Sequence, residues 1–207
     1  MCESCALVGA SRLLRVATVV YVLRHDARAA PSKWIPSYAG PFVLYMDRMY
    51  SCPPPDNKEN MFDVHIRPSH FRSPSLVQTT LQTLDGNFTW KTTVDDSWVG
   101  VLKSDLWNNN QWKENSILYR IPRGFCSTIR TNFPGLYETF YGVSALTKTP
   151  CRFPKKTYIL DNKPINWTMP NFPVLPYGRF KTTCLTFSAK NDKAACFVFE
   201  VNIVAKL

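Results

Sequence analysis

The feature that most constrains the fold is the stretch of residues 151–207, which opens with a cysteine and continues through a proline-rich apolar loop. It closes with two segments, 179–188 and 196–205, in which apolar and polar residues alternate. In the second segment Phe197, Phe199, Val201 and Ile203 share one face, and Val198, Glu200 and Asn202 share the other. Alternation with a period of two is typical of strands with one buried face, so the two segments are predicted to form an antiparallel hairpin.

The loop before this hairpin carries many apolar side chains. Three prolines and one glycine between residues 167 and 178 keep it out of regular sheet. Apolar residues on a loop tip cannot all be core, so they predict a surface that touches something apolar. We call this loop the lip, and its predicted contact residues are Trp167, Met169, Phe172, Val174, Leu175 and Tyr177.

The rest of the chain has mostly strand character. Strands are predicted at 43–51, 62–67, 76–84, 88–94, 98–106, 117–121 and 158–160, with a hairpin turn at the Asp85-Gly86 pair. Apolar residues at spacings of three and four within 126–145 predict one short helix, or two turns broken at Pro134-Gly135. The predicted fold class is all-β with a short helical insert, an antiparallel β-sandwich or β-cup of seven to nine strands.

The start of the chain resembles an export signal. Residues 13–23 are apolar except for Arg15, and a small-x-small cleavage pattern follows at 27–29. The alternatives are a buried N-terminal helix or, less in keeping with the short run, a membrane anchor. We expect an atypical signal peptide over residues 1–30 and a single domain over 31–207. Glycosylation sequons at Asn87 and Asn166 agree with export to the extracellular space or, alternatively, to the lysosomal lumen.

The charge balance favours anionic partners. The chain carries a formal net charge of +10, and removal of residues 1–30 takes away four arginines and two acidic residues. In an exported protein this excess indicates an anionic membrane surface or acidic glycans rather than nucleic acid, although a solvated basic face is the simpler interpretation.

Five cysteines follow the predicted leader, which is enough for two disulfides and one free thiol. Spacing alone leaves fifteen arrangements open. No pair has the spacing of zinc ligands, so neither a metal nor a cofactor is expected. Catalytic signatures are also lacking. Asp63 and His65 share a strand face, but an exposed polar face explains them more simply, so no enzyme is expected.

Two apolar groups exceed what a core requires. One is the lip; the other is the helical face formed by Phe133, Leu136, Tyr137 and Phe140. If both lie at one open end of a sandwich, they line the mouth of an apolar cavity. Such a cavity would bury acyl chains at about 0.8 kcal/mol per methylene.

The C-terminal part resembles the ganglioside activator-like branch of the ML (lipid-recognition) superfamily, and within it the insect chemosensory B-type secreted proteins. The residues that carry the resemblance are Pro150-Cys151-x-Phe153-Pro154, Lys156-Thr157-Tyr158, Pro170-x-x-Pro173-x-x-Pro176-x-Gly178-x-Phe180 and Cys196. It extends loosely over about 150 residues, from Cys52 onward. It implies a β-cup with a cavity between two sheets, disulfides Cys52–Cys196 and Cys126–Cys151, and a lip that contacts membrane. The activator's two further disulfides are missing here, and Cys184 has no counterpart.

The resulting expectation is a secreted, monomeric lipid-binding or lipid-transfer protein that extracts or carries a lipid or glycolipid. It would present this ligand to a soluble hydrolase as the sphingolipid activators do, and would be at most an enzyme activator. The alternative is an extracellular interaction module, or a chemosensory cue-binding protein, that docks a receptor or hydrolase through its apolar lip.

Overall fold

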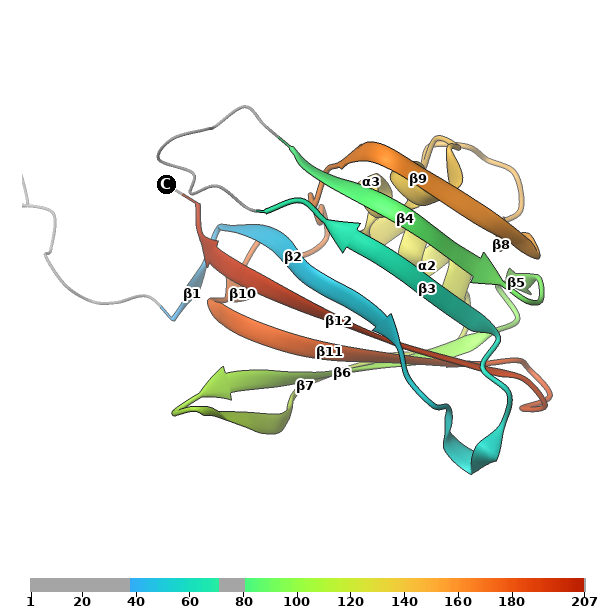
Figure 1. Ribbon diagram of the computed structural model, residues 1–207, viewed down its shortest axis with the longest axis horizontal. Helices are drawn as coiled ribbons and strands as arrows, with labels where there is room; N and C mark the ends of the chain where they lie inside the picture. Colours follow the sequence, from blue (N-terminus) through green and yellow to red (C-terminus); the bar gives the residue numbers. More distant parts are fainter. Residues whose placement is uncertain (1–37, 71–80, 207) are drawn as a thin grey trace, which may run out of the picture. The chain divides into compact units, whose positions relative to one another are not determined.

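The computed structural model describes residues 38–70 and 81–206 (Figure 1). The predicted leader, residues 1–30, lies outside the described residues, as do residues 76–80 of one predicted strand. Among the described residues, no helix has the length and apolar character needed to cross a bilayer.

Eight antiparallel strands form the main sheet. In spatial order they are β7 (Gln111–Ile121), β6 (Val99–Asn108), β11 (Gly178–Phe187), β12 (Ala194–Ala205), β2 (Phe42–Ser51), β3 (Phe62–Pro68), β4 (Gln82–Trp90) and β9 (Lys156–Ile165). Two pairs of two-residue strands lie beside it: β1 (Ala39–Gly40) with β10 (Leu175–Pro176), and β5 (Val94–Asp95) with β8 (Arg152–Phe153). A 3-10 turn, η1 (Pro55–Asn57), follows β2.

The sheet is continuous but weakly joined in its middle. β2 and β3 pair at only two positions, Met49↔Ile66 and Tyr50↔His65, whereas β3 and β4 pair at seven. Because so short a ladder lets neighbouring strands diverge, the sheet divides into a five-strand layer ending at β2 and a three-strand layer beginning at β3. The predicted class, all-β with a short helical insert, is confirmed, with the two layers of the cup joined along one side.

Two helices cover one face of the three-strand layer, behind β3, β4 and β9 in the view of Figure 1. They are α2 (Phe125–Asn132) and α3 (Pro134–Tyr141). Phe133 leaves the helical region between them, with φ −131° and ψ 57°. Pro134 then starts α3, where its missing N–H is not needed, and Gly142 ends it in the left-handed conformation. The predicted break at Pro134-Gly135 therefore falls at the start of α3.

The predicted hairpin at Asp85-Gly86 is wrong. β4 runs straight through this pair, and the register with β9 shifts between Leu84 and Gly86. Gly86 has a φ of 121°, and a Cβ on it would lie 1.9 Å from the carbonyl oxygen of His65. Gly86 therefore allows a β-bulge inside a strand. Because β4 pairs with β3 on one side and β9 on the other, the chain continues as a strand here despite the local turn signal.

Both edge strands are longer than predicted. β7 covers 11 residues and β9 covers 10, where the apolar pattern indicated 117–121 and 158–160. Most of their added residues are exposed and polar, so hydrophobic alternation could not reveal them. The turn between β6 and β7 uses Asn109 and Asn110, both with positive φ, as two-residue hairpins require.

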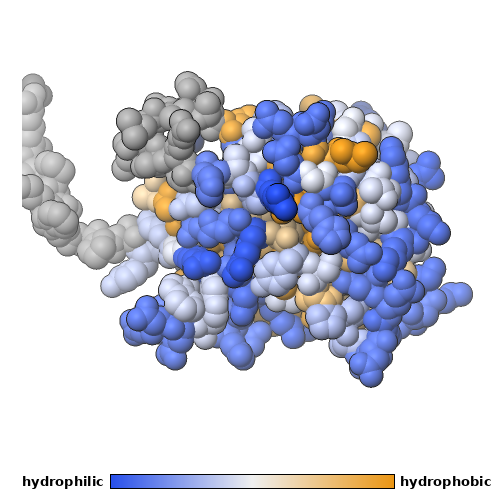
Figure 2. All heavy atoms as spheres, viewed as in Figure 1, coloured by the Kyte–Doolittle hydropathy of each residue, from blue (hydrophilic) through white to orange (hydrophobic). Residues whose placement is uncertain are grey.

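The outer face of the five-strand layer hides one charged residue. Glu200 was predicted on the polar face of β12, yet its side chain is only 1% exposed. Arg48 Nη2 lies 2.6 Å and Arg179 Nη2 2.8 Å from its carboxylate oxygens, so two guanidinium groups cover it. Figure 2 shows that hydrophilic side chains dominate the face in view, as expected for the solvated side of a sheet.

Candidate functional site

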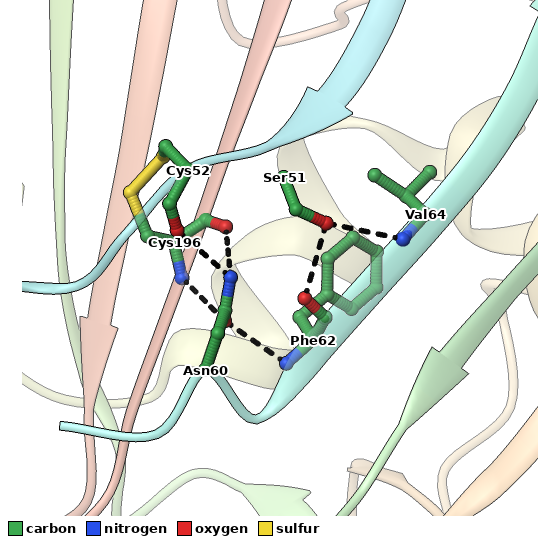
Figure 3. The surroundings of a disulfide bond; sticks show 6 residues. All are labelled: Ser51, Cys52, Asn60, Phe62, Val64 and Cys196. Atoms are coloured by element: carbon green, nitrogen blue, oxygen red, sulfur yellow. Dashed lines mark hydrogen bonds between the residues drawn. A yellow bond between two sulfur atoms is a disulfide. The ribbon is translucent and has the colours of Figure 1, made fainter.

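The two disulfides implied by the family resemblance are both present. Cys52–Cys196 joins the end of β2 to the start of β12, and Cys126–Cys151 joins α2 to the residue before β8. Asn60 holds the first of them. Its Nδ2 donates to the carbonyl oxygens of Cys52 (2.9 Å) and Cys196 (2.8 Å), and its Oδ1 accepts from the N–H groups of Cys196 and Phe62 (Figure 3).

Helix α2 is capped by a residue from a distant turn. Asp96 Oδ1 accepts the N–H of Ser127 at 2.7 Å, and its Oδ2 accepts the Ser127 hydroxyl at 2.6 Å. An acidic side chain at a helix N-terminus satisfies free N–H groups and suits the helix dipole. Asp96 also lies near the sulfurs of Cys126 and Cys151, but those sulfurs are bonded to each other and offer no thiolate to a metal.

An apolar cavity of about 90 Å³ lies between the sheet and the helices. Among the residues that the structure describes, no charged side chain lines it. From the strands of the main sheet it is lined by Leu44, Met46, Met49, Phe62, Trp90, Leu102, Cys184, Phe197, Phe199 and Val201. The remaining lining residues are Phe125, Ile129, Phe133, Leu136, Phe140 and Tyr141 from α2, α3 and their junction, with Phe153, Trp167 and Met169. Phe197, Phe199 and Val201 therefore face the same way, as the alternation in β12 predicts.

A groove of about 460 Å³ adjoins this cavity. Leu44, Trp167 and Met169 line both, so these three side chains lie between the groove and the cavity. Leu81, Phe172 and other apolar residues form much of the groove, and the cationic side chain of Lys206 also lines it. The groove thus forms the mouth of the cup.

Gln82 closes this mouth with four hydrogen bonds. Its Oε1 accepts the N–H of Met46 (3.0 Å) and Nε1–H of Trp167 (2.9 Å), and its Nε2 donates to the carbonyl oxygens of Met46 (2.7 Å) and Ser69 (3.0 Å). The side chain thus bridges β4 and β2 where the β2–β3 ladder has ended. Sequence reasoning missed Gln82, although its alternation with Leu84 in a predicted strand was a usable signal.

The predicted lip residues take different positions. Trp167 and Met169 line the cavity, and Phe172 lines the groove, with its ring 6.3 Å from that of Phe133. Val174 is 53% exposed. Leu175 and Tyr177 line neither space: Leu175 belongs to β10, and the Tyr177 hydroxyl donates to the carbonyl oxygen of Pro41 at 3.0 Å.

The predicted helical face mostly reaches the cavity. Phe133, Leu136 and Phe140 line it, but Tyr137 is packed in the core between Tyr141 and Phe153. Cys184, which the family resemblance left unexplained, is a buried free thiol on the cavity wall, and burial raises its pKa. The thiol therefore stays protonated and acts as a small apolar group.

Both predicted glycosylation residues are exposed. Asn87 lies on β4, and Asn166 follows β9 at the base of the lip. Asn166 Oδ1 accepts the N–H (2.9 Å) and the hydroxyl (2.6 Å) of Thr168. Elsewhere, Asp63 forms an ion pair with Lys91 at 3.2 Å, which gives it a structural partner.

No family model matches the sequence, and no curated protein matches it. Among solved structures, the chain is similar to chicken MD-1 in a crystal structure of its complex with lipid IVa. The identity is 13%, the alignment covers 76% of this chain and 99% of that one, and the TM-score is 0.28. A similarity at this level does not establish the family of the chain.

Proposed function

We propose that the protein is a secreted lipid carrier that shields the apolar part of one lipid inside the cup. The observation that carries the proposal is the apolar cavity with its own mouth. A cavity lined by no charged side chain among the described residues, beside a groove that shares Leu44, Trp167 and Met169 with it, suits a hydrocarbon chain and offers no charged partner to an ionic substrate. Carriage of this kind requires no catalytic residue.

The lip moves when the ligand enters. A cavity of about 90 Å³ is smaller than the roughly 150 Å³ cavity that admits benzene in an engineered protein, so an acyl chain needs more room. Trp167 and Met169 separate the cavity from the groove, and displacing them joins the two spaces. Each methylene that then leaves water contributes about 0.8 kcal/mol.

The mouth also supports the proposal that the protein docks on an anionic membrane. Three large hydrophobic residues are exposed around it: Tyr38 (84%), Leu81 (55%) and Val174 (53%). Leu81 lines the groove, and the N–H of Tyr177 in the lip donates to the carbonyl oxygen of Tyr38. Exposed apolar groups beside a cavity mouth, on a basic protein, suit the collection of lipid from a bilayer.

The decisive experiment is extraction of the purified secreted protein with organic solvent, followed by mass spectrometry, together with titration of a fluorescent single-chain lipid. Val201→Phe places a large ring in the cavity and is expected to weaken probe binding at least tenfold. Ile159→Phe is the matched control, since Ile159 is 76% exposed on β9. The proposal fails if the wild-type protein yields no lipid and binds no probe, or if Val201→Phe binds like the wild type.

A further inference from the structure

Two side chains on the wall of the cavity form a polar point. Trp90 Nε1–H donates to the hydroxyl oxygen of Tyr141 at 3.0 Å, and both side chains line the cavity. Trp90 is the last residue of β4, whereas Gln82, which holds Trp167 at the mouth, is the first. Nine residues of strand separate the two ends by roughly 25 Å at about 3.3 Å per residue. The residues that line the cavity therefore include both Trp167, which Gln82 holds, and the Trp90–Tyr141 pair.

Among the described side chains that line the cavity, the hydroxyl of Tyr141 is a strong hydrogen-bond donor without an acceptor. Trp90 donates its N–H to Tyr141, and Trp167 donates its N–H to Gln82. The Cys184 thiol is a weak donor. A phenol that accepts a hydrogen bond still has its own hydrogen to donate, and within residues 38–70 and 81–206 no group accepts the hydrogen of Tyr141.

The surroundings of Tyr141 keep this hydroxyl protonated and in place. Its ring stacks on Phe153 with a centroid distance of 4.4 Å and meets Tyr158 edge-on at 5.2 Å. Burial raises the pKa of Tyr141 well above its usual value, so the group is a neutral donor at every physiological pH. A fixed neutral donor in an apolar space favours a ligand that brings an acceptor.

We propose that the ligand is a long, slender aliphatic molecule with one uncharged oxygen acceptor near the end that enters first, such as a ketone, aldehyde or ester, and that Tyr141 donates its hydrogen to this oxygen. The inference rests on the proposed lipid carriage and adds the chemistry that selects the ligand. A carboxylate or phosphate is disfavoured at this position, because none of the described residues that line the cavity is a cation that could balance a buried charge. A plain hydrocarbon would leave the Tyr141 hydrogen unpaired.

The test uses 2-tridecanone and tridecane, which share a chain length and differ in one oxygen. Each displaces a fluorescent apolar probe from the full chain and from the Tyr141→Phe variant. The wild type is expected to prefer the ketone, and the variant is expected to lower the ratio of ketone to alkane affinity roughly two- to tenfold, the value of one neutral hydrogen bond. Because the alkane reports any change of cavity shape, the ratio isolates the hydrogen bond.

Infrared spectroscopy of the bound ketone gives an independent readout on the wild type. Its carbonyl stretch is expected to move to lower wavenumber than in a hydrocarbon solvent, and to return in Tyr141→Phe. If both ligands bind and the affinity ratio is the same in the two proteins, or the carbonyl band does not move, the assignment to Tyr141 is wrong and lipid carriage stands. If neither the ketone nor the alkane binds the wild type, the carrier proposal falls, and this inference with it.

Discussion

On the side of β2 that faces β3, the ladder of backbone hydrogen bonds does not continue from Met49 toward Met46. The side chain of Gln82 supplies hydrogen bonds to β2 in its place. Both backbone groups of Met46 bond to this one amide side chain, which is 8% exposed. Gln82→Met keeps the length of the side chain but leaves the N–H of Met46 without its partner. We expect a loss of about 1–3 kcal/mol in the free energy of unfolding, measured by urea denaturation.

Gln111→Met is the control for this substitution, because Gln111 is exposed at the start of β7 and should change stability by less than about 0.5 kcal/mol. Trp167 also loses its acceptor in Gln82→Met, so its fluorescence emission should shift. Equal stabilities for the two variants would mean that Gln82 does not hold the mouth.

Glu200 is the second residue whose substitution should lower the stability of the sheet. Glu200→Gln removes the charge that Arg48 and Arg179 share across β2, β12 and β11. These arginine side chains are 62% and 39% exposed, and solvent screens them. We therefore expect a loss of about 1–2 kcal/mol, less than for a fully buried pair.

The control for Glu200→Gln is Glu59→Gln, since Glu59 is 69% exposed and pairs with Lys91 at the surface. Thermal unfolding should show a lower midpoint for Glu200→Gln than for the wild type. The midpoint of Glu59→Gln should be almost unchanged. A Glu200→Gln midpoint equal to that of the wild type would show that the buried charge contributes nothing.

At the scale of elements, α3 reaches the sheet through a glycine. A Cβ on Gly135 would lie 2.0 Å from the carbonyl oxygen of Asn166, directly after β9. Alanine favours a helix by about 1 kcal/mol over glycine, so helix propensity and packing oppose each other here. We expect the packing effect to be the larger of the two, because the backbone of Asn166 must shift to make room for the new Cβ. Gly135→Ala should therefore lower the free energy of unfolding by about 1–3 kcal/mol, measured by chemical denaturation.

Thr131→Ala tests propensity alone, since Thr131 is exposed on α2, and it should leave stability unchanged or slightly raised. A stabilised Gly135→Ala variant would contradict the close approach of α3 to the start of the lip.

The lip is the element expected to meet the membrane. Val174→Ser removes an exposed apolar group with little effect on folding, and we expect it to weaken binding to vesicles that contain anionic lipid by roughly threefold or more. Sedimentation of the protein with the vesicles measures this. Ile159→Ser changes a similarly exposed aliphatic residue on β9 and should bind like the wild type. Equal losses in both variants would point to a non-specific surface effect.

At the scale of the molecule, two disulfides close loops of very different size. Cys52 and Cys196 are 144 residues apart, and Cys126 and Cys151 are 25 apart. In the entropic model the first stabilises the fold by about 5 kcal/mol and the second by about 3.5 kcal/mol. Replacing Cys52 and Cys196 by serine should therefore lower the unfolding midpoint more than replacing Cys126 and Cys151.

Calorimetry on the two double-serine variants ranks them, with Cys184→Ser as the control because its sulfur is unpaired. If the loss of Cys126–Cys151 lowered the midpoint more, the contacts that this disulfide holds between α2 and the residue before β8 would contribute more stability than closure of the larger loop.

Much of the fold follows from local patterns. β2, β3, β6, β11 and β12 appear where alternation predicted strands, and the helices appear where the spacing of three and four predicted them. The patterns failed at positions where the burial of side chains does not alternate regularly along the sequence. β7 and β9 are edge strands, whose solvent-facing residues carry no apolar period, and Asp85-Gly86 became a bulge because β3 and β9 pair with β4 on both sides.

The candidate site was predictable in part. Of the ten residues predicted for lip and mouth, Trp167, Met169, Phe133, Leu136 and Phe140 line the cavity. Sheet residues such as Met46, Cys184 and Phe197 were not foreseen as cavity wall. An inward-facing residue of a strand looks the same in sequence whether it meets a neighbour or a void. Only packing distinguishes the two.

The sequence by itself determined that the chain is a β protein with a short helical insert, and it placed an apolar loop before the last hairpin. These properties depend on the period of apolar residues and on proline and glycine, which act within a few positions of the chain. The tertiary structure alone decided that Gln82 meets Trp167 at one end of β4 and that Trp90 meets Tyr141 at the other. Those partners are 85 and 51 residues apart, and a hydrogen bond over such a separation depends on how strands and helices pack.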